Sequence, residues 1–260
     1  MNNTIKRYIP KWLKVLYCRL AMMVSRFKYF FYGSSMPEAK EIPIIINNFN
    51  RLTSLKLLIE SLITRGYCNI HIIDNASTYP PLLEYYKICP YEIYRLDRNI
   101  GYKAIWESGI YDKFKHSYYV YTDADMQIDN CCPIDFMERF LQIMDKHPFC
   151  QKVGFGIRID DLPDYFSKKQ QVIEHESKYW INEIERGVFR AAIDTTFALY
   201  RPFCKGATSP YQETYRTGEP YIIRHLPWYT DTSSLSEEEM YYVNSVTRST
   251  HWSAQIKKDS

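Results

Sequence analysis

Short apolar runs alternate with helical periodicity through the first 150 residues. The apolar runs are rich in Ile, Val and Tyr, which predicts strands at 42–48, 69–75, 91–96 and 117–125. Between them, apolar residues recur three and four positions apart, which predicts helices at 51–66, 80–89, 101–114 and 133–148. This order predicts an α/β fold: a mostly parallel, twisted sheet with helices on both faces.

The pattern is looser after residue 150. It predicts a strand at 150–159, a polar loop at 160–171, a helix at 172–184, a strand at 191–201 and a strand running into an aromatic loop at 220–231. A last helix is expected within 233–246, with Ser234 or Ser236 as its N-cap and acids in its first turn. We expect one catalytic domain over 37–260, with halves at 37–150 and 151–260.

The first 36 residues form a separate basic segment and linker. No acid precedes Glu38, whereas residues 1–34 carry Lys6, Arg7 and five further cations among many aromatic side chains. Its uncharged runs, such as 20–25, are far shorter than the roughly 20 residues that span a bilayer. The segment is typical of an amphipathic helix at a membrane interface. The alternative is a helix packed on the protein's own core, with its cations in water.

Composition narrows the class of protein. The net charge of +3 is too small to indicate a polyanion partner, so no nucleic acid is expected. The seven cysteines are odd in number and lack a C-x-x-C spacing, which favours a reducing cytosol over a disulfide framework or a zinc knuckle. The 24 tyrosines suit half-wet surfaces such as sugar sites, although compositional drift explains them equally well.

Polar residues follow three of the predicted strands. The first strand runs into Asn47-Asn48-Phe49-Asn50-Arg51, the second into Asp74-Asn75-Ala76-Ser77, and the fourth into Asp123-Ala124-Asp125. Open α/β sheets bind ligands beyond the carboxyl ends of their strands, where these side chains would lie. Two carboxylates one residue apart suit Mg²⁺ or Mn²⁺ bridging a diphosphate. A solvated turn is the alternative for Asp123 and Asp125.

Several common nucleotide and hydrolase motifs are missing from the sequence. It has no G-x-G-x-x-G after the first strand and no G-x-x-x-x-G-K-[ST], which disfavours a Rossmann site and a P-loop. It also has no H-E-x-x-H and no G-x-S-x-G, which removes the simplest hydrolase classes.

Four motifs in order resemble those of the GT-A-fold nucleotide-sugar glycosyltransferases, especially the family-two enzymes of bacterial surface polysaccharide synthesis. They are IPIIINNFNR, IHIIDNAST, RNIGYKAIWESGI and VYTDADM, and together they cover roughly residues 40–130. The resemblance implies a GT-A-like fold, a nucleoside-diphosphate-sugar donor with UDP expected, a divalent metal, and a glycan or lipid-linked acceptor. With the basic segment 1–34, it also implies a cytoplasmic enzyme held peripherally at the cytoplasmic face of the membrane.

The resemblance assigns roles to residues that match its motifs. By it, Asp74 contacts the base, Asn48 and Arg51 line the nucleotide pocket, Asn99 and Gly101 border the ribose and diphosphate, Asp123 holds ribose and metal, and Asp125 is the more direct metal ligand. Simpler structural roles are open for some of them: an Asx turn at Asp74 and a plain helix-entry turn at Asn99.

The second half lacks the family's usual Glu-Asp pair, so the general base is open. Asp194 is our first choice, because it follows small residues and is expected to open the strand at 191–201, although a turn-capping role fits equally well. His225 is the predicted third metal ligand, with Arg224 as a phosphate partner; a histidine bonded within its loop beside Trp228 is the alternative. The other candidate bases are Asp160, Asp161, Glu213, Glu219 and Asp231.

Two other functions compete with glycosyl transfer. A sugar nucleotidyltransferase would carry a glycine-rich basic loop after the first strand, where this chain has NNFNR. A non-catalytic binding protein on the same fold would not need both Asp123 and Asp125.

Overall fold

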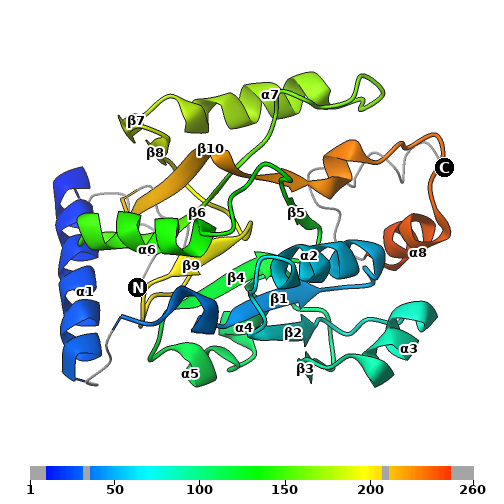
Figure 1. Ribbon diagram of the computed structural model, residues 1–260, viewed down its shortest axis with the longest axis horizontal. Coiled ribbons are helices and arrows are strands. Elements are labelled where there is room, and N and C mark those ends of the chain that lie inside the picture. Colours follow the sequence, from blue (N-terminus) through cyan, green and yellow to red (C-terminus); the bar gives the residue numbers. More distant parts are fainter. Residues whose placement is uncertain (1–9, 32–35, 207–210, 247–260) are drawn as a thin grey trace.

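The computed structural model describes residues 10–31, 36–206 and 211–246 (Figure 1). The cations Lys6 and Arg7 and most of the predicted linker at 33–37 lie outside these ranges. Within them, the basic segment forms one long helix, α1 (Lys11–Phe31), as predicted. Among the described helices, none combines the length and apolar character needed to cross a bilayer.

The first half alternates strands and helices as predicted. Its strands are β1 (Ile44–Asn48), β2 (Ile70–Asp74), β3 (Glu92–Arg95), β4 (Tyr119–Asp123) and β5 (Met126–Ile128). Its longer helices are α2 (Thr53–Ile63), α3 (Pro80–Ile88) and α6 (Phe136–Lys146). The short helical turns are η2 (Ala39–Glu41), η3 (Gly101–Lys103), α4 (Ala104–Glu107) and α5 (Tyr111–Phe114).

The strands of both halves join one sheet in the order β3-β2-β1-β4-β9-β6-β10-β8-β7, with β5 paired to β10. The pairs β1–β2, β1–β4, β2–β3 and β6–β10 are parallel, whereas β9 (Ala198–Tyr200) runs antiparallel between β4 and β6 (Cys150–Ile157). The parallel α/β sheet expected from the sequence is therefore confirmed for the centre of the molecule, where β3, β2, β1 and β4 all run parallel.

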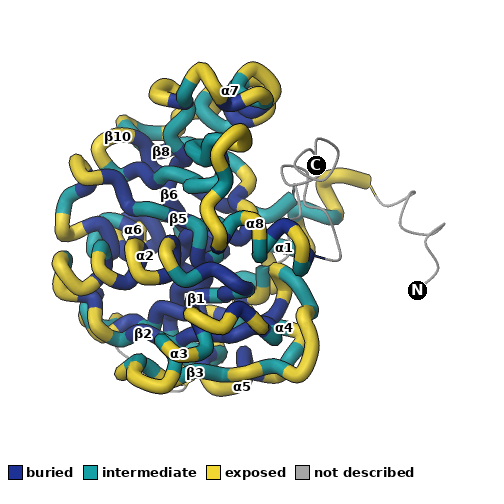
Figure 2. The backbone as a smooth tube through the Cα atoms, turned by 90° about the vertical axis from the view of Figure 1, so that its right-hand side faces the viewer, coloured by how far each residue is buried: buried dark blue, intermediate teal, exposed yellow. Residues whose placement is uncertain are grey.

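The side chains of β1 alternate between two hydrophobic clusters, one on each face of the sheet. Ile44 and Ile46 join the buried cluster under α2, α3 and α6, whereas Ile45 faces the cluster built with α4 and α5. Because successive strand side chains point to opposite faces, an apolar run such as 44–46 needs cover on both sides. Helices therefore lie on both faces, and the strands run through the buried centre (Figure 2).

The helix predicted at 101–114 is broken. Gly109 has a φ of +83°, which ends α4 and lets the chain restart as α5. Glycine adopts a positive φ readily, whereas other residues do so at a cost in energy. The apolar periodicity of 101–114 therefore continues across a break in the helix.

The second half differs more from the expected pattern. Helix α7 (Lys169–Ser177) begins inside the predicted loop, followed by η4 (Lys178–Trp180) and an unpredicted hairpin of β7 (Glu183–Glu185) and β8 (Val188–Arg190). Strand β10 (Glu213–His225) starts seven residues earlier than expected and leads into η5 (Leu226–Tyr229). Helix α8 (Glu237–Ser245) is capped by Ser236, whose hydroxyl accepts from the Glu239 amide. Ser236 is one of the two N-caps that the sequence predicted.

Candidate functional site

The acid-x-acid turn lies at the carboxyl end of β4, beside the end of β1. The parallel register pairs Asn47 with Asp123, and the Ala124 amide donates to the Asn47 carbonyl at 3.0 Å. The chain then turns into β5, which pairs with the end of β10 and sets Met126 opposite His225. Residues 100 positions apart in sequence therefore meet at one sheet edge, as the topology predicts.

Asp123 is held by neutral donors from both halves. Its Oδ1 accepts from Asn47 Nδ2 at 3.2 Å, and its Oδ2 accepts from the Thr195 hydroxyl at 2.5 Å. Burial, followed by the negative charge of Asp125, raises the pKa of Asp123 to about 7. The carboxyl group of Asp123 is therefore harder to ionise than that of an ordinary aspartate.

Asp125 lies beside His225 and within the field of Arg51. Its Oδ2 lies 3.6 Å from His225 Nε2, and the Leu226 amide donates to its backbone carbonyl at 2.9 Å. Burial acts to raise the pKa of Asp125, but His225 and then Arg51 outweigh it and hold that pKa below its ordinary value. Asp125 therefore stays ionised at neutral pH.

His225 is placed by an aromatic neighbour. Its ring meets Trp228 edge-on, with centroids 4.8 Å apart. Its Nδ1 is buried and finds no hydrogen-bond partner among the described residues. The observed position of His225 is thus compatible both with packing beside Trp228 and with binding a metal. Its role as a metal ligand stays a prediction.

Arg51 is fixed by the last described helix. Its guanidinium pairs with Glu239 and lies 3.7 Å from the Tyr242 ring centroid. The neighbouring Glu238 accepts from the Thr53 amide and hydroxyl, at 3.0 and 2.8 Å, and so caps α2. The clasp between α8 and the start of α2 thus holds a positive charge close to the acidic turn.

The predicted nucleotide residues of β1 and β2 lie deeper. Asn48 is buried, with Nδ2 donating to the Tyr86 hydroxyl at 2.9 Å. Asp74 is fully buried, and its carboxylate accepts from the Ser77 amide at 3.1 Å and from Arg95 Nε at 3.0 Å. Asp74 thus has a structural role in closing the turn after β2, through an amide three residues on and not two as in the Asx turn weighed for it. Its contact with a base stays a prediction.

We expect Asp74→Ala to lower the free energy of unfolding by about 2 kcal/mol, because Ser77 and Arg95 each lose an acceptor. Urea denaturation measures this, with exposed Asp97→Ala as the matched control. Equal stability of Asp74→Ala and the parent would contradict the structural role. The KM for the donor, measured on the folded variant, tests the contact with the base separately. A raised KM supports the contact, whereas an unchanged KM leaves Asp74 with its role in the turn alone.

A loop next to β2 is built on Asn75. Its Oδ1 accepts from the Ile100 amide at 2.8 Å, and its Nδ2 donates to the Gly101 carbonyl at 3.0 Å. Asn99 is exposed and accepts from the Gly101 amide at 2.9 Å, which is the helix-entry turn considered for it. The φ of Gly101 is +81°, so this turn favours glycine.

Three site side chains were missed by the sequence analysis: Asn47, Asn75 and Thr195. Of the two asparagines that end β1, we named Asn48, yet alternation turns Asn47 toward Asp123. The strand-end motif already contained both, so the direction of the side chains was the lacking signal. Thr195 carries no motif and reaches the site through the placement of β9.

Asp194 does not open a strand, because β9 starts four residues later at Ala198. It lies exposed in the loop before β9, next to Thr195, and its charge contributes to the raised pKa of Asp123. The other candidate bases have different engagements: Glu213 pairs with Arg19, Asp161 with Arg224, Glu219 and Asp160 with Arg158, and Asp231 accepts from Ser233.

Arg224 is committed to acids rather than open to a phosphate. Its guanidinium lies 2.5 Å from both Asp129 and Asp161, and Asp161 also accepts from the Tyr229 hydroxyl at 2.5 Å. The charge of Arg224 is therefore already balanced within the fold, and its role as a phosphate partner stays a prediction.

A buried lysine supports the loop that carries Asp194. Lys152 of β6 is 2% exposed, and its Nζ donates to the Ile193 carbonyl at 2.7 Å and to the Tyr200 hydroxyl at 3.3 Å. Burial lowers the pKa of Lys152 to about 8.

The depressed pKa of Lys152 predicts a pH-dependent stability. In the unfolded chain the amine binds its proton up to about pH 10.5, so the folded state is penalised below pH 8 and the penalty is relieved as pH rises. Between pH 7 and 9.5, the parent should gain about 2 kcal/mol of unfolding free energy relative to Lys152→Met. Urea denaturation at both pH values measures the gain; parallel pH profiles of the two proteins would contradict it.

The donor chemistry suits a hard divalent cation, although no metal cluster is assembled. Within the described residues, no three His, Cys, Asp or Glu side chains are grouped so that they could hold an ion as they stand. Asp123 turns to Asn47 and Thr195, whereas Asp125 turns to His225. The ligand set of Asp123, Asp125 and His225 stays a prediction that requires side-chain rotation.

Comparisons with known proteins match the architecture only distantly. No family model and no curated protein matches the chain. Among solved structures, GalNAc-T7 with UDP, GalNAc and Mn²⁺ matches at 15% identity and a TM-score of 0.47, over 70% of this chain and 43% of its own. S. aureus TarS matches at 10% and 0.41, over 84% and 42%.

A third match is glucosyl-3-phosphoglycerate synthase from Mycobacterium tuberculosis in complex with phosphoglyceric acid, at 14% identity and a TM-score of 0.36, over 63% of this chain and 59% of its own. The chain thus spans less than half the length of GalNAc-T7 and of TarS. Matches with TM-scores below 0.5 carry no argument about activity, which rests on the chain's own side chains.

Proposed function

We propose that the chain is a metal-dependent glycosyltransferase that moves a sugar from a nucleoside-diphosphate sugar to a glycan or lipid-linked acceptor in surface polysaccharide synthesis. The observation that carries the proposal is the acid-x-acid turn of Asp123 and Asp125 at the carboxyl end of β4, with His225 3.6 Å from Asp125. The four sequence motifs supply the nucleotide-sugar class, with UDP as the expected carrier.

A divalent Mn²⁺ or Mg²⁺ ion would be held by Asp125, with Asp123 and His225 in support. The fit rests on donor chemistry: two carboxylates and an imidazole whose Nδ1 is unpartnered among the described residues. When bound, such an ion offsets the negative charge of the leaving diphosphate.

The chain's own residues would divide the remaining work. Arg51, held by Glu239 and Tyr242, adds positive charge near the diphosphate. Asn47 and Thr195 orient Asp123. The loop at 99–101, fixed by Asn75, would border the ribose.

Asp194 would act as the general base of an inverting transfer. The acceptor oxygen forms a bond to the anomeric carbon, the bond from that carbon to the diphosphate oxygen breaks, and the electron pair leaves with the nucleoside diphosphate. The acceptor's proton goes to the Asp194 carboxylate. Exposure suits this role, because the base must meet an incoming acceptor.

We also propose that the protein works in the cytoplasm, held peripherally at the cytoplasmic face of a membrane. Helix α1, with cations throughout and no acid in its sequence, supports this placement.

The deciding experiment is a panel of nucleotide sugars, assayed for donor hydrolysis and for transfer with Mn²⁺, with Mg²⁺ and with EDTA. Release of a nucleoside diphosphate that requires the metal supports the proposal. Release of pyrophosphate or formation of a nucleotide sugar would instead identify a nucleotidyltransferase. Donor-dependent thermal stabilisation without any turnover would identify a binding protein.

A further inference from the structure

Helix α1 presents a continuous apolar face to solvent. Trp12, Leu16, Met23, Phe27 and Phe30 fall on one stripe of the helix, at 100° per residue. Ten large apolar side chains of α1 are exposed by 38–76%: Trp12, Leu13, Leu16, Tyr17, Leu20, Met23, Val24, Phe27, Phe30 and Phe31. Patches of this kind on a soluble protein mark an interaction surface.

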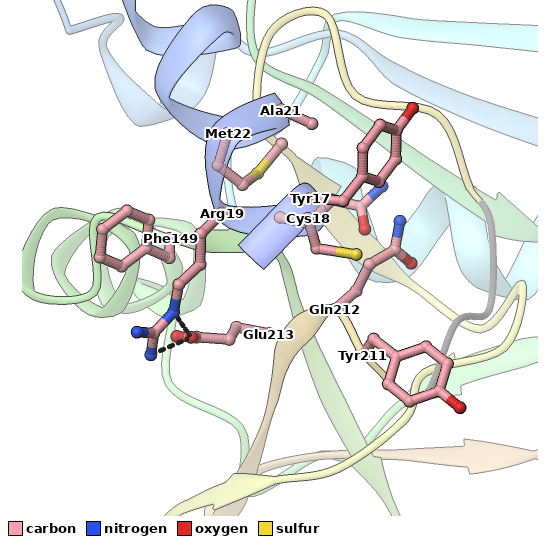
Figure 3. A pocket seen from close by; sticks show the side chains of 10 residues that line it. Tyr17, Cys18, Arg19, Ala21, Met22, Phe149, Tyr211, Gln212 and Glu213 are labelled. Atoms are coloured by element: carbon pink, nitrogen blue, oxygen red, sulfur yellow. Dashed lines mark hydrogen bonds and ion pairs between the residues drawn. The ribbon is translucent and has the colours of Figure 1, made fainter. Parts of the chain in front are cut away.

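The opposite face of α1 fastens the helix to the body. Ser25 is buried and donates to the Pro202 carbonyl, and the Tyr29 ring meets Tyr118 edge-on at 5.5 Å. Arg19 pairs with Glu213 at 3.0 Å. Figure 3 shows this pair in a small pocket at the seam, between Tyr17, Cys18 and Met22 of α1 and the start of β10 with the preceding Tyr211 and Gln212. The weighed alternative of a core-packed helix is therefore true of one face and leaves the other exposed.

The charges on α1 select the occupant of its exposed face. Arg26 and Lys28 are exposed and flank Phe27, about 100° away on either side. Because α1 contains no acid, two copies packed face to face would bring like charges together. Aromatic rings bordered by cations complement a surface of acyl chains under anionic headgroups.

The site lies at the far end of the strands that α1 covers. Helix α1 contacts Tyr118, just before β4, and Glu213, the first residue of β10. The acidic turn ends β4 at Asp123, and His225 ends β10. Thirteen residues of β10 span at most roughly 40 Å at ~3.3 Å per residue. Figure 1 shows α1 and α8 at opposite ends of the molecule.

We infer that the exposed face of α1 docks on an anionic lipid surface and turns the candidate site away from it. For the acceptor, a part that rests on the proposed function, this orientation selects a class: a hydroxyl carried well clear of the lipid, at the end of an extended glycan or on a soluble molecule. A sugar or phosphate attached directly to a short lipid headgroup is disfavoured.

Vesicle sedimentation of the full chain tests the docking. Phe27→Ser/Phe30→Ser should reduce partition onto phosphatidylcholine vesicles containing phosphatidylglycerol by about a hundredfold, since each exposed ring contributes about tenfold. Ile88→Ser/Ile181→Ser is the matched control, because these side chains are 81% and 78% exposed elsewhere, and it should bind like the parent. Arg26→Gln/Lys28→Gln should reduce binding to anionic vesicles by about tenfold or more.

Two results would overturn the docking. One is equal vesicle binding by the parent and Phe27→Ser/Phe30→Ser at equal melting temperature. The other is a parent that does not bind vesicles but is dimeric by light scattering, with the same variant monomeric, which would make a second copy the occupant.

Hydrogen exchange with and without vesicles tests the orientation, without any transfer assay. Protection should increase within 11–31 and stay unchanged at 226–229 and 237–245. Protection at those two segments would overturn the orientation. Because neither experiment measures turnover, a failure of the proposed function leaves both results interpretable; the acceptor class is tested separately, by comparing soluble glycans with short lipid-linked sugars.

Discussion

Asp125→Asn should reduce metal-dependent transfer by about a thousandfold or more while leaving the fold intact. The carboxylate lies at a turn, 22% exposed, and is the one acid of the pair that His225 and Arg51 keep ionised. An amide retains the size of the side chain but cannot offset the charge of a divalent cation beside a diphosphate. Losing several kcal/mol of transition-state stabilisation corresponds to that factor in kcat.

Single-turnover transfer with Mn²⁺ measures the loss, and circular dichroism checks the fold. Asp164→Asn is the matched control, because its side chain is 99% exposed and pairs with Lys169 far from the turn. His225→Ala should weaken metal affinity by about tenfold to a hundredfold. Near-normal turnover of Asp125→Asn in the presence of EDTA would refute the metal assignment.

Asp194→Asn should lower the rate of transfer by about a hundredfold to ten-thousandfold and leave donor binding unchanged. The base acts in the chemical step, so the loss falls on kcat and not on the affinity for donor or metal. The loop position next to Thr195 brings this carboxylate close enough to raise the pKa of Asp123. Removing its charge should therefore also lower the pKa of Asp123.

Separate measurement of kcat and of the donor KM distinguishes a catalytic from a structural effect. Asp194→Asn should lower kcat alone, whereas a structural defect would also change the donor KM or the melting temperature. Asp160→Asn is the control, since Asp160 was a candidate base and its side chain is 70% exposed beside Arg158. Normal turnover of Asp194→Asn, or an equal loss in Asp160→Asn, would remove Asp194 from the mechanism.

The sequence predicted the first half of the fold well because its signals are local. Buried parallel strands need apolar runs, and Ile44–Asn48 and Tyr119–Asp123 carry them clearly. Their polar ends predicted which sheet edge holds the acids. In contrast, β9 is three residues long and antiparallel, and its position between β4 and β6 depends on pairing that no local pattern encodes.

The sequence predicted which strand ends form the candidate site, but not the directions in which their side chains point. Asp125 and His225 lie 3.6 Å apart, although His225 was inferred from residue type in a loop, whereas Asp123 faces Asn47 and Thr195. Asn47 and Asn48 look alike in sequence, and which one faces Asp123 follows from the phase of the strand. The support given by Lys152 could not be inferred, because a buried lysine appears in sequence as one more surface cation.

The clasp between α8 and α2 has a consequence for biosynthesis. Glu238 meets Thr53 at a sequence separation of 185, so this contact can form only after nearly all of the described chain has left the ribosome. Until then the first turn of α2 lacks its cap and Arg51 lacks Glu239 and Tyr242. Strands β1 to β4 can pair early during translation, whereas the proposed site is complete only once α8 has docked. Incomplete chains should therefore fold in part without the proposed activity.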